Sequence, residues 1–259
     1  MEKKAKPKAL ASCVGGNEKF PYLRTTLSPT VTCKLKKMLN YDKIYLIGET
    51  HSSRPFRGEI DKYDLAEPEI SRGENKVSEI VPVKHSMGGK TLYDVIWTTN
   101  AFPLIVSDRV IELFKSNGIT GWQTYTVKIY SKKNELIDQK YHGLILTGRC
   151  GYQDFSQSSI VMDKIGITTE PHAKGFYFKD NYWDGTDLFM CKTDENGEST
   201  MFRFCSQKVA DLIKKEKIKN LSLKKTTDFS LSISLYDIKL TDKQKFEMEI
   251  LKTSRKHGV

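Results

Sequence analysis

The segment KYHGLILTGRCG, residues 140–151, places three side chains that serve in acyl transfer close together in the sequence. Cys150 is a potential nucleophile, because a neighbouring arginine such as Arg149 can lower the pKa of a thiol. A cysteine nucleophile also needs a base aligned with its sulfur, and His142 is eight residues away. One strand rises ~3.3 Å per residue, so His142 and Cys150 can share a face of it but not a location. A contact across strands stays open. We favour a structural cysteine in a stretch whose glycines permit bends or close packing.

A second polar segment, GETHSSRPFRG at 48–58, follows an expected strand over 43–49. It offers four acidic, basic or cationic side chains: Glu49, His51, Arg54 and Arg57. Functional residues favour loops on a rigid scaffold, so these residues define an alternative hypothesis, an enzyme of unknown reaction. That hypothesis predicts that His51→Ala abolishes activity without loss of folding. The simpler interpretation is a solvated loop, because the segment matches no named motif.

Other motifs of known chemistry are incomplete. The stretch KHSMGGKT (84–91) ends like a phosphate-binding loop but has Lys84 where that motif requires glycine. The stretch DNYWDGTD (180–187) has Cys191 where a calcium loop requires a bidentate glutamate. The five histidines lack the spacing of zinc ligands. The sequence therefore predicts no cofactor and no metal site.

The composition indicates a globular protein rather than a membrane-spanning one. Of the 259 residues, 38% are hydrophobic and 29% are charged, and no run approaches the roughly 20 apolar residues of a spanning helix. The cysteines are odd in number, widely spaced and without a C-x-x-C pair, which favours reduced thiols in a cytoplasmic protein. They are Cys13, Cys33, Cys150, Cys191 and Cys205.

The net charge of +10 is concentrated at the two ends of the chain. Residues 1–40 carry nine Lys and Arg against two acids (+7), and residues 208–259 carry thirteen against seven (+6), which leaves about −3 for the middle. Nucleic-acid binding through these basic ends is a weaker alternative function. A nucleic-acid reader usually interleaves basic and aromatic residues on one face, whereas charge runs of this kind are more often solvated surface.

An internal repeat organises the second half of the sequence. LIVSDRVIELFKSNGITGW (104–122) aligns without gaps on RFCSQKVADLIKKEKIKNL (203–221). Each copy predicts a strand, a serine at the helix N-cap, a short amphipathic helix and a return to extended chain.

Strand patterns surround this repeat. A hairpin is expected from 122–130 and 141–148, and alternation predicts a strand over 228–236. Thr241 and Gln244 form a capping box that opens a last helix. The segment 91–99 fits a helix or a strand. The expected fold class is α+β, mostly antiparallel sheet with the duplicated strand-helix-strand unit and a C-terminal helix.

Three regions are expected along the chain. Residues 1–20 form a flexible basic tail, residues 21–90 an irregular N-terminal region that includes a long loop at 52–76, and residues 91–259 the α+β domain.

Residues 95–225 resemble the predicted immunity proteins of bacterial polymorphic toxin systems. The resemblance rests on V-S-D-R at a strand-to-helix step, T-G-W after that helix, Y-H-G…T-G-R-C-G, and W-D-G-T-D. It implies a non-enzymatic cytoplasmic protein that binds and blocks a cognate toxin, and it implies no catalytic residues.

Aromatic side chains are candidate anchors for such a partner, because Trp, Tyr and Arg dominate binding hot spots. The candidate contact residues are Tyr125, Tyr182, Trp183 and Asp184. Trp122 is expected in the core instead, since it aligns with Leu221 in the repeat. Nuclease toxins tend to be basic because they bind phosphate. A protein with a charge of +10 therefore predicts a partner that is not a strongly basic nuclease, or an interface in the mildly acidic middle of the chain.

Overall fold

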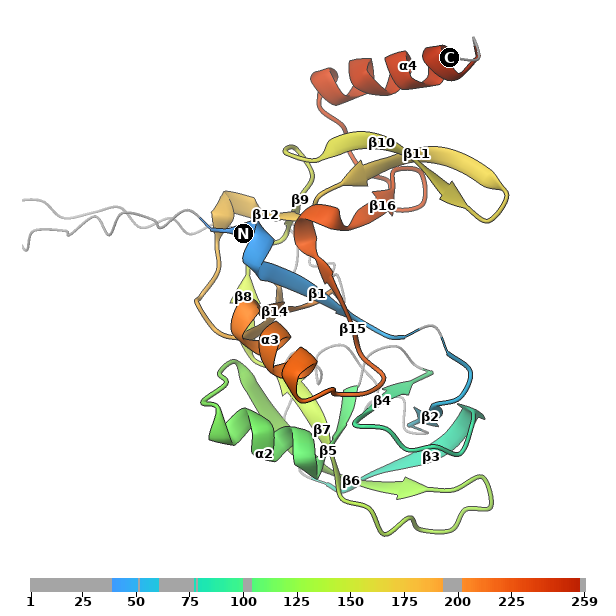
Figure 1. The fold of residues 1–259 in the computed structure, drawn as a ribbon, viewed down its shortest axis with the longest axis vertical. Coiled ribbons are helices and arrows are strands. Elements are labelled where there is room, and N and C mark those ends of the chain that lie inside the picture. The colour runs from blue at the N-terminus through green and yellow to red at the C-terminus, as the bar shows by residue number, and fades with distance from the viewer. Residues whose placement is uncertain are drawn as a thin grey trace, which may run out of the picture. The chain divides into compact units, whose positions relative to one another are not determined.

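The fold is α+β with mostly antiparallel sheets, as the sequence predicts (Figure 1). The computed structural model describes residues 39–50, 52–60, 77, 79–99, 104–192 and 202–256. The expected basic tail at 1–20, most of the expected loop at 52–76, and His51 lie outside the described residues.

A five-stranded sheet pairs the first described strand with strands from late in the chain. Its strand order is β15-β1-β14-β13-β8, all antiparallel except the β13–β8 pair. Figure 1 shows the N-terminal β1, in blue, beside the C-terminal β15, in orange. The strands are β1 (Ile44–Gly48), β8 (Gly148–Cys150), β13 (Leu188–Cys191), β14 (Arg203–Ser206) and β15 (Ser222–Lys225).

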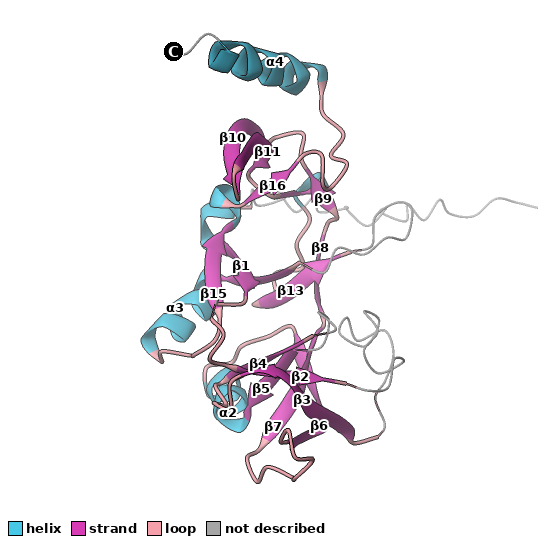
Figure 2. Ribbon diagram, turned by 90° about the vertical axis from the view of Figure 1, so that its right-hand side faces the viewer, coloured by secondary structure: helices cyan, strands magenta, loops and turns pink. Residues whose placement is uncertain are grey.

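A closed barrel forms from the middle of the sequence, in the order β2-β3-β6-β7-β5-β4. Figure 2 shows these strands in magenta beside the helix α2. The expected hairpin is β6 with β7, and the ambiguous segment 91–99 contains strand β4. The elements are β2 (Phe56–Glu59), β3 (Val81–Gly88), β4 (Val95–Thr98), β5 (Leu104–Ser107), α2 (Asp108–Ser116), β6 (Trp122–Tyr130) and β7 (Tyr141–Leu146).

Smaller sheets and the last helix complete the fold. Strands β10, β11 and β16 form one antiparallel sheet, β9 pairs with β12, and helix α4 packs on β10. The elements are β9 (Gln153–Asp154), β10 (Ser159–Ile165), β11 (Thr168–Lys174), β12 (Tyr177–Phe178), α3 (Gln207–Lys215), β16 (Ser230–Ser232) and α4 (Asp242–Lys256). Three short 3₁₀ turns are η1 (Tyr41–Lys43), η3 (Lys179–Asn181) and η4 (Thr226–Asp228).

The duplicated unit predicted from the sequence is confirmed. In the first copy β5, α2 and β6 follow one another, and in the second β14, α3 and β15 do so, with strand and helix bounds offset by the same 99 residues up to the helix end. Both helices end in the same motif, in which the amide N–H of Ile119 bonds to the Phe114 oxygen and that of Ile218 to the Ile213 oxygen. The left-handed residue before each is Gly118 or Lys217.

The equivalence extends beyond the aligned segments. The strand order β6-β7-β5-β4 in the barrel matches β15-β1-β14-β13 in the sheet, with antiparallel pairing throughout both sets. One strand of each set has a different place along the chain. In the first copy the strand between β6 and β5 is β7, which follows the helix. In the second copy the matching strand, between β15 and β14, is β1, which comes from the start of the described chain. The copies are therefore related by a circular permutation.

One hydrophobic cluster contains residues of both copies. Val110 and Phe114 of α2 belong to it together with Val209 and Ile213 of α3, and all four are buried. A second cluster fills the barrel, and a third, rich in phenylalanine, lies on the other side of the five-stranded sheet. The copies are thus joined through their helix-covered faces.

Two expectations about element boundaries need correction. The alternating stretch 228–236 is a strand only over β16, because the chain then turns and leaves Leu235 74% exposed. The border expected after residue 90 does not separate two folding units, because β1, β2 and β3 pair with strands of the region 91–259. No helix in the described part of the chain is long and apolar enough to cross a membrane.

Candidate functional site

The residues of the 140–151 motif do not form a catalytic site. His142 Nε2 lies 2.8 Å from Asp108 Oδ1 on the first turn of α2, and this hydrogen bond lowers the pKa of the Asp108 carboxyl. Arg149 Nη1 donates to the carbonyl oxygens of Leu146 and Gly148, both at 2.8 Å. The side chains of His142 and Arg149 are thus held by parts of the framework.

Cys150 is a structural cysteine in this arrangement. Its side chain is fully buried, and its Sγ lies 3.7 Å from Sγ of Cys191 on the neighbouring strand β13. Burial, followed by the contact with Cys191, raises the pKa of the Cys150 thiol. The sequence suggests that Arg149 lowers the pKa of this thiol. It does not do so here, because the thiol lies in an apolar layer. Cys150, Cys191 and Cys205 are all free thiols.

Glycines of this motif serve close packing. A Cβ on Gly143 would fall 1.9 Å from the ring of Tyr125, and one on Gly148 would fall 1.9 Å from Thr186 Oγ1. The expectation that the glycines of this segment serve geometry is therefore correct for these two positions.

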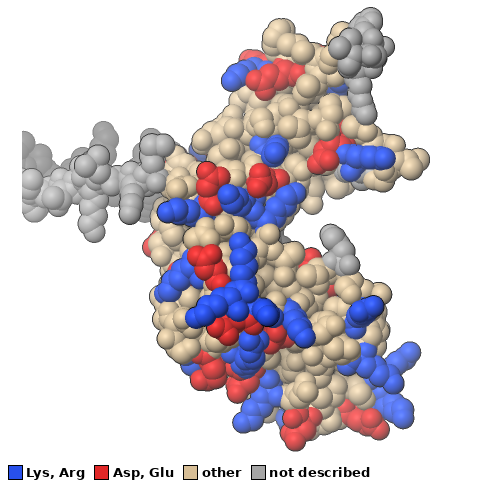
Figure 3. Space-filling view, in the orientation of Figure 1, with Lys and Arg blue, Asp and Glu red and all other residues tan. Residues whose placement is uncertain are grey.

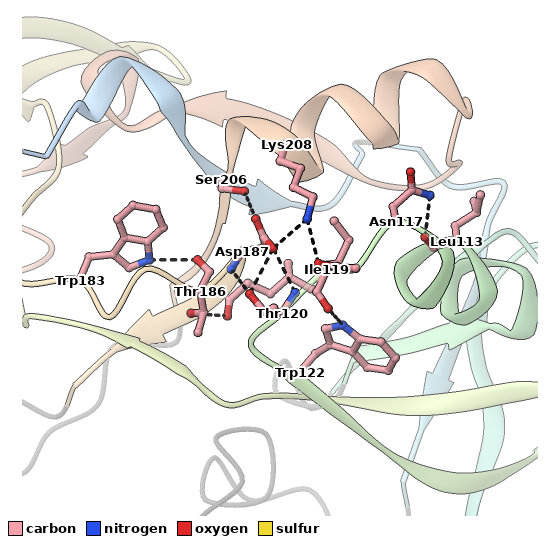
Figure 4. Close-up of polar contacts among 12 residues, drawn as sticks. Leu113, Asn117, Ile119, Thr120, Trp122, Trp183, Thr186, Asp187, Ser206 and Lys208 are labelled. Atoms are coloured by element: carbon pink, nitrogen blue, oxygen red, sulfur yellow. Dashed lines mark hydrogen bonds and ion pairs between the residues drawn. The ribbon is translucent and has the colours of Figure 1, made fainter.

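A carboxylate that sequence reasoning missed organises the contact between the two copies. Asp187 precedes β13, and its Oδ1 accepts a hydrogen bond from Ser206 Oγ at 2.8 Å. Its Oδ2 accepts from the backbone N–H and the hydroxyl of Thr120, each at 3.1 Å, and lies 3.5 Å from Lys208 Nζ. Lys208 also donates to the Gly118 oxygen near the end of α2, at 2.8 Å. Figure 4 shows Asp187 at the centre of these contacts.

Asp94, which precedes β4, makes the equivalent contacts in the other copy. Its Oδ1 lies 3.1 Å from Arg109 Nη1 and 3.4 Å from Ser107 Oγ, and its Oδ2 accepts from the Lys219 backbone N–H at 2.9 Å. Arg109 also donates to the Glu216 oxygen at the end of α3, at 2.7 Å.

We call Asp94 and Asp187 with these partners the aspartate clamps. Each carboxylate binds the serine and the cation of its own copy and a backbone N–H from the loop of the other copy. All four carboxylate oxygens have a partner, so the clamps fasten the two copies and leave no carboxylate oxygen free for catalysis. A gapless alignment hides the equivalence, because the segment from Asp187 to Ser206 is six residues longer than that from Asp94 to Ser107.

Of the four residues expected to form a polar site, the structure brings two together. Glu49 and Arg57 meet: Arg57 Nε donates to Glu49 Oε1 at 2.8 Å, and Nη2 contacts Oε2. Both line a pocket of about 620 Å³, together with Leu46, Gly48, Thr50, Ser52, Ser222, Lys224 and Phe229. Arg54 is exposed and does not line this pocket, and His51 lies outside the described residues.

The pocket lies against strands β1 and β15 of the five-stranded sheet. Leu46 and Gly48 of β1 face it beside their strand partners Lys224 and Ser222 of β15. The absence of a side chain at Gly48 matters here, since a Cβ would come 2.9 Å from Ser222 Oγ. Ser222 Oγ in turn donates to the Glu49 carbonyl at 3.0 Å. The result is a recess with an apolar end at Leu46 and Phe229 and a charged end at Glu49 and Arg57.

Among the expected partner contacts, Tyr125 is the exception. Its side chain is only 7% exposed and belongs to the barrel core, so the expectation that it is available to a partner is wrong. Alternation along β6 turns it inward, where Gly143 makes room for its ring. Burial raises the pKa of the Tyr125 hydroxyl.

The remaining partner candidates lie on the loop between η3 and β13. Tyr182 is 36% exposed, with Lys192 Nζ 4.2 Å from its ring centre. Trp183 is half-buried, because its ring packs on Phe189 and its Nε1 donates to the Thr186 oxygen at 3.0 Å. Asp184 is exposed but shapes the loop, since its Oδ2 accepts from the Arg149 backbone N–H at 2.6 Å.

Trp122, expected in the core, is half-buried against the shared cluster, and its Nε1 donates to the Ile119 oxygen at 2.8 Å. Within the described ranges, no group of three or more His, Cys, Asp or Glu side chains is placed to hold a metal ion. Comparison with known proteins finds no family model that matches the chain and no curated protein with significant similarity.

Proposed function

We propose that this protein is a non-enzymatic binding protein of the cytoplasm that neutralises a cognate bacterial toxin by contact with it. The observation that carries the proposal is that the polar side chains of the 140–151 motif are engaged in contacts within the fold. Its cysteine is buried against another thiol, and its histidine is bonded to a helix carboxylate. The segment that most resembles an acyl-transfer site thus serves the framework.

The sequence resemblance over residues 95–225 supplies the class of partner. The accessible loop that carries Tyr182, Trp183 and Asp184 supports a binding role, because it combines an amphipathic ring with polar groups on a framework fixed by hydrogen bonds.

The test uses the full chain and the proteins encoded beside it. Co-expression with a neighbouring toxin should restore growth, and the two proteins should co-purify in a fixed ratio. The matched variants are Tyr182→Ala on the candidate loop and Tyr236→Ala on a distant exposed turn. Restored growth without a complex, or no effect on any neighbouring toxin, would contradict the proposal.

A second candidate function is an enzyme that uses the pocket of Glu49 and Arg57. The observation in its favour is an ion-paired carboxylate on the wall of a recess of about 620 Å³. This function predicts that a small molecule raises the melting temperature of the natural protein and not of a Glu49→Gln variant. It also predicts that His51→Ala abolishes turnover of that molecule while the melting curve is unchanged.

A further inference from the structure

A lysine-rich segment lies where α3 leads into β15. The segment KKEKIKNLSLKK, residues 214–225, has six lysines and one acid. Lys and Arg side chains lie on the face that carries α3, with Asp and Glu between them (Figure 3). From the sequence we expect the C-terminal lysines to be solvated surface. In the structure two of them, Lys224 and Lys225, lie on the edge strand β15.

Most of these lysines have no carboxylate partner among the described residues. Among the described residues, one ion pair involves a lysine of this segment: Lys215 Nζ lies 4.0 Å from Glu216 Oε1. Three others lie over rings: Lys214 at 5.2 Å from the centre of Tyr45, Lys219 at 5.7 Å from Tyr93, and Lys224 at 5.7 Å from Phe229. Lys217 and Lys225 are exposed. An excess of charge of one sign favours a partner of the opposite sign.

The strand at this surface has an open edge. In the part of the chain that the structure describes, β15 is the end strand of its sheet and pairs with β1 alone. The backbone groups on such an edge can bind an added extended chain, and pockets beside it then select alternate side chains.

The recess described above lies directly beside this edge. Ser222 and Lys224 are two residues apart on β15 and both line it. An added strand would place every second side chain on the same face, over the apolar end formed by Leu46 and Phe229. Lys225 is exposed next to Lys224, so two cations lie together at one end of this edge.

We propose that the outer edge of β15 binds an acidic, extended segment of the protein partner. The added segment forms a strand on the sheet, its carboxylates pair with Lys224 and Lys225, and one apolar side chain enters the recess of about 620 Å³. This inference rests on the proposed function and specifies the chemistry of the partner.

Nucleic acid fits this surface less well. The basic segment contains no arginine, and the rings of Tyr45, Tyr93 and Phe229 are each approached by a lysine ammonium rather than left bare for base stacking. A free strand edge also offers alternating N–H and C=O groups, which only a polypeptide complements along its length. Lysines on an edge can serve simply to prevent self-association, and the binding experiment separates that role from the proposed one.

The experiment measures fluorescence anisotropy of labelled probes with the full chain at an ionic strength of about 0.15 M. The probe is a short capped peptide of glutamates with one central Val, so that carboxylates lie on both faces of the added strand, as Lys224 and Lys225 do on β15. A second peptide has the same sequence with every other amide N-methylated, and the third probe is oligothymidylate. We expect saturable binding of the first peptide and roughly tenfold weaker binding of the N-methylated one, because it cannot complete the strand ladder.

Charge reversal locates the binding surface. Lys224→Glu combined with Lys225→Glu should weaken peptide binding by roughly tenfold or more. The matched control combines Lys245→Glu with Lys252→Glu on the exposed side of α4, and it should leave binding unchanged. If the first variant does not fold, Lys224→Gln combined with Lys225→Gln removes the same two cations without adding negative charge, and it should weaken binding in the same direction.

Several outcomes would overturn the proposal: no peptide binding, equal binding by both charge-reversal variants, equal binding of the N-methylated peptide, or tighter binding of oligothymidylate. The toxin assay separates this inference from the proposed function. A toxin complex that survives reversal at Lys224 and Lys225 rejects the edge and leaves the function standing. Peptide binding without any toxin complex supports the edge and rejects the function.

Discussion

At the scale of single residues, polar side chains of the two copies hold strands to the starts of the helices. His142 bonds to Asp108 on α2, and the equivalent strand residue Tyr45 bonds to Gln207 on α3 at 2.8 Å. The same position therefore holds the helix start in both copies with different chemistry. His142 is therefore engaged with Asp108 and is not placed to act on Cys150, although the two residues are close in the sequence.

The aspartate clamps give a residue-scale prediction. Asp187→Ala should lower the free energy of unfolding by about 2 kcal/mol or more, because it leaves the Ser206 and Thr120 donors and the Lys208 ammonium without their acceptor. Asp94→Ala should have a similar effect, because its contacts are equivalent. Urea unfolding monitored by circular dichroism measures both.

The control for the clamps is Glu112→Ala, which removes an exposed ion pair with Lys115 on α2. Its effect should stay within about 0.5 kcal/mol. Equal effects of Asp187→Ala and Glu112→Ala would show that the clamp does not stabilise the contact between the copies.

Two tyrosines, the half-buried Tyr41 and the buried Tyr141, predict a loss of stability at high pH. Burial raises the pKa of Tyr41 and of Tyr141 from 10.0 to about 12. Below about pH 10 both phenols are neutral folded or unfolded, so their contacts are fully retained. Between about pH 10 and pH 12 the unfolded chain releases these protons while the folded chain holds them, so stability falls as the pH rises.

Urea midpoints measured across this range, with tyrosinate absorbance, test that window. Tyr41→Phe and Tyr141→Phe should each flatten the decline, because each removes one of the titrating groups. A decline of the same size in the double variant would assign it to other residues.

At the scale of elements, the last helix is attached through its first turn. The expected capping box is confirmed: the Thr241 backbone N–H donates to Gln244 Oε1 at 3.0 Å, and the Gln244 N–H donates to Thr241 Oγ1 at 3.3 Å. Gln244 is also buried, and its amide donates to the carbonyls of Phe155 and Ser158 at 2.7 and 2.8 Å. One residue thus caps α4 and docks it.

Gln244→Ala should therefore release α4 while the sheets stay folded. Hydrogen exchange over residues 242–256 should become roughly tenfold faster or more, which matches the loss of about 1–2 kcal/mol expected for a cap and its buried hydrogen bonds. Lys243→Ala, on the exposed side of the same turn, should leave the exchange nearly unchanged. Equal exchange in the two variants would mean that apolar contacts alone hold the helix.

At the scale of the whole described chain, the circular permutation makes the first strands indispensable. β14 pairs with β1 and β13, and β15 pairs with β1, so the second copy has its central strand from residues 44–48. The barrel likewise takes β2 and β3 from residues before 91.

A fragment of residues 91–259 should therefore fail to fold. Without β1, the facing edges of β14 and β15 are unpaired and their buried residues are exposed to water. Circular dichroism and size exclusion of the fragment and of the full chain measure this. A fragment with a cooperative melting transition would show that the region after residue 90 is a domain by itself.

The local patterns that could be read from the sequence are those set by short-range physics. The repeat, the hairpin of β6 and β7, strand β1 and the capping box of α4 depend on side-chain periodicity and on caps within a few residues. Alternation misled at 228–236, because the chain turns after Ser232 and no partner strand continues there.

Tertiary structure alone decided which side chains meet. The burial of Cys150 against Cys191 and of Tyr125 against Gly143, and the position of β1 inside a sheet of late strands, depend on contacts between segments distant in the chain or on strand pairing. Local sequence does not encode them, because a backbone edge accepts any strand that buries its neighbours well. The sequence by itself determined the elements and the duplication, and the packing of the two permuted copies decided which of their polar residues are held within the framework and which are exposed.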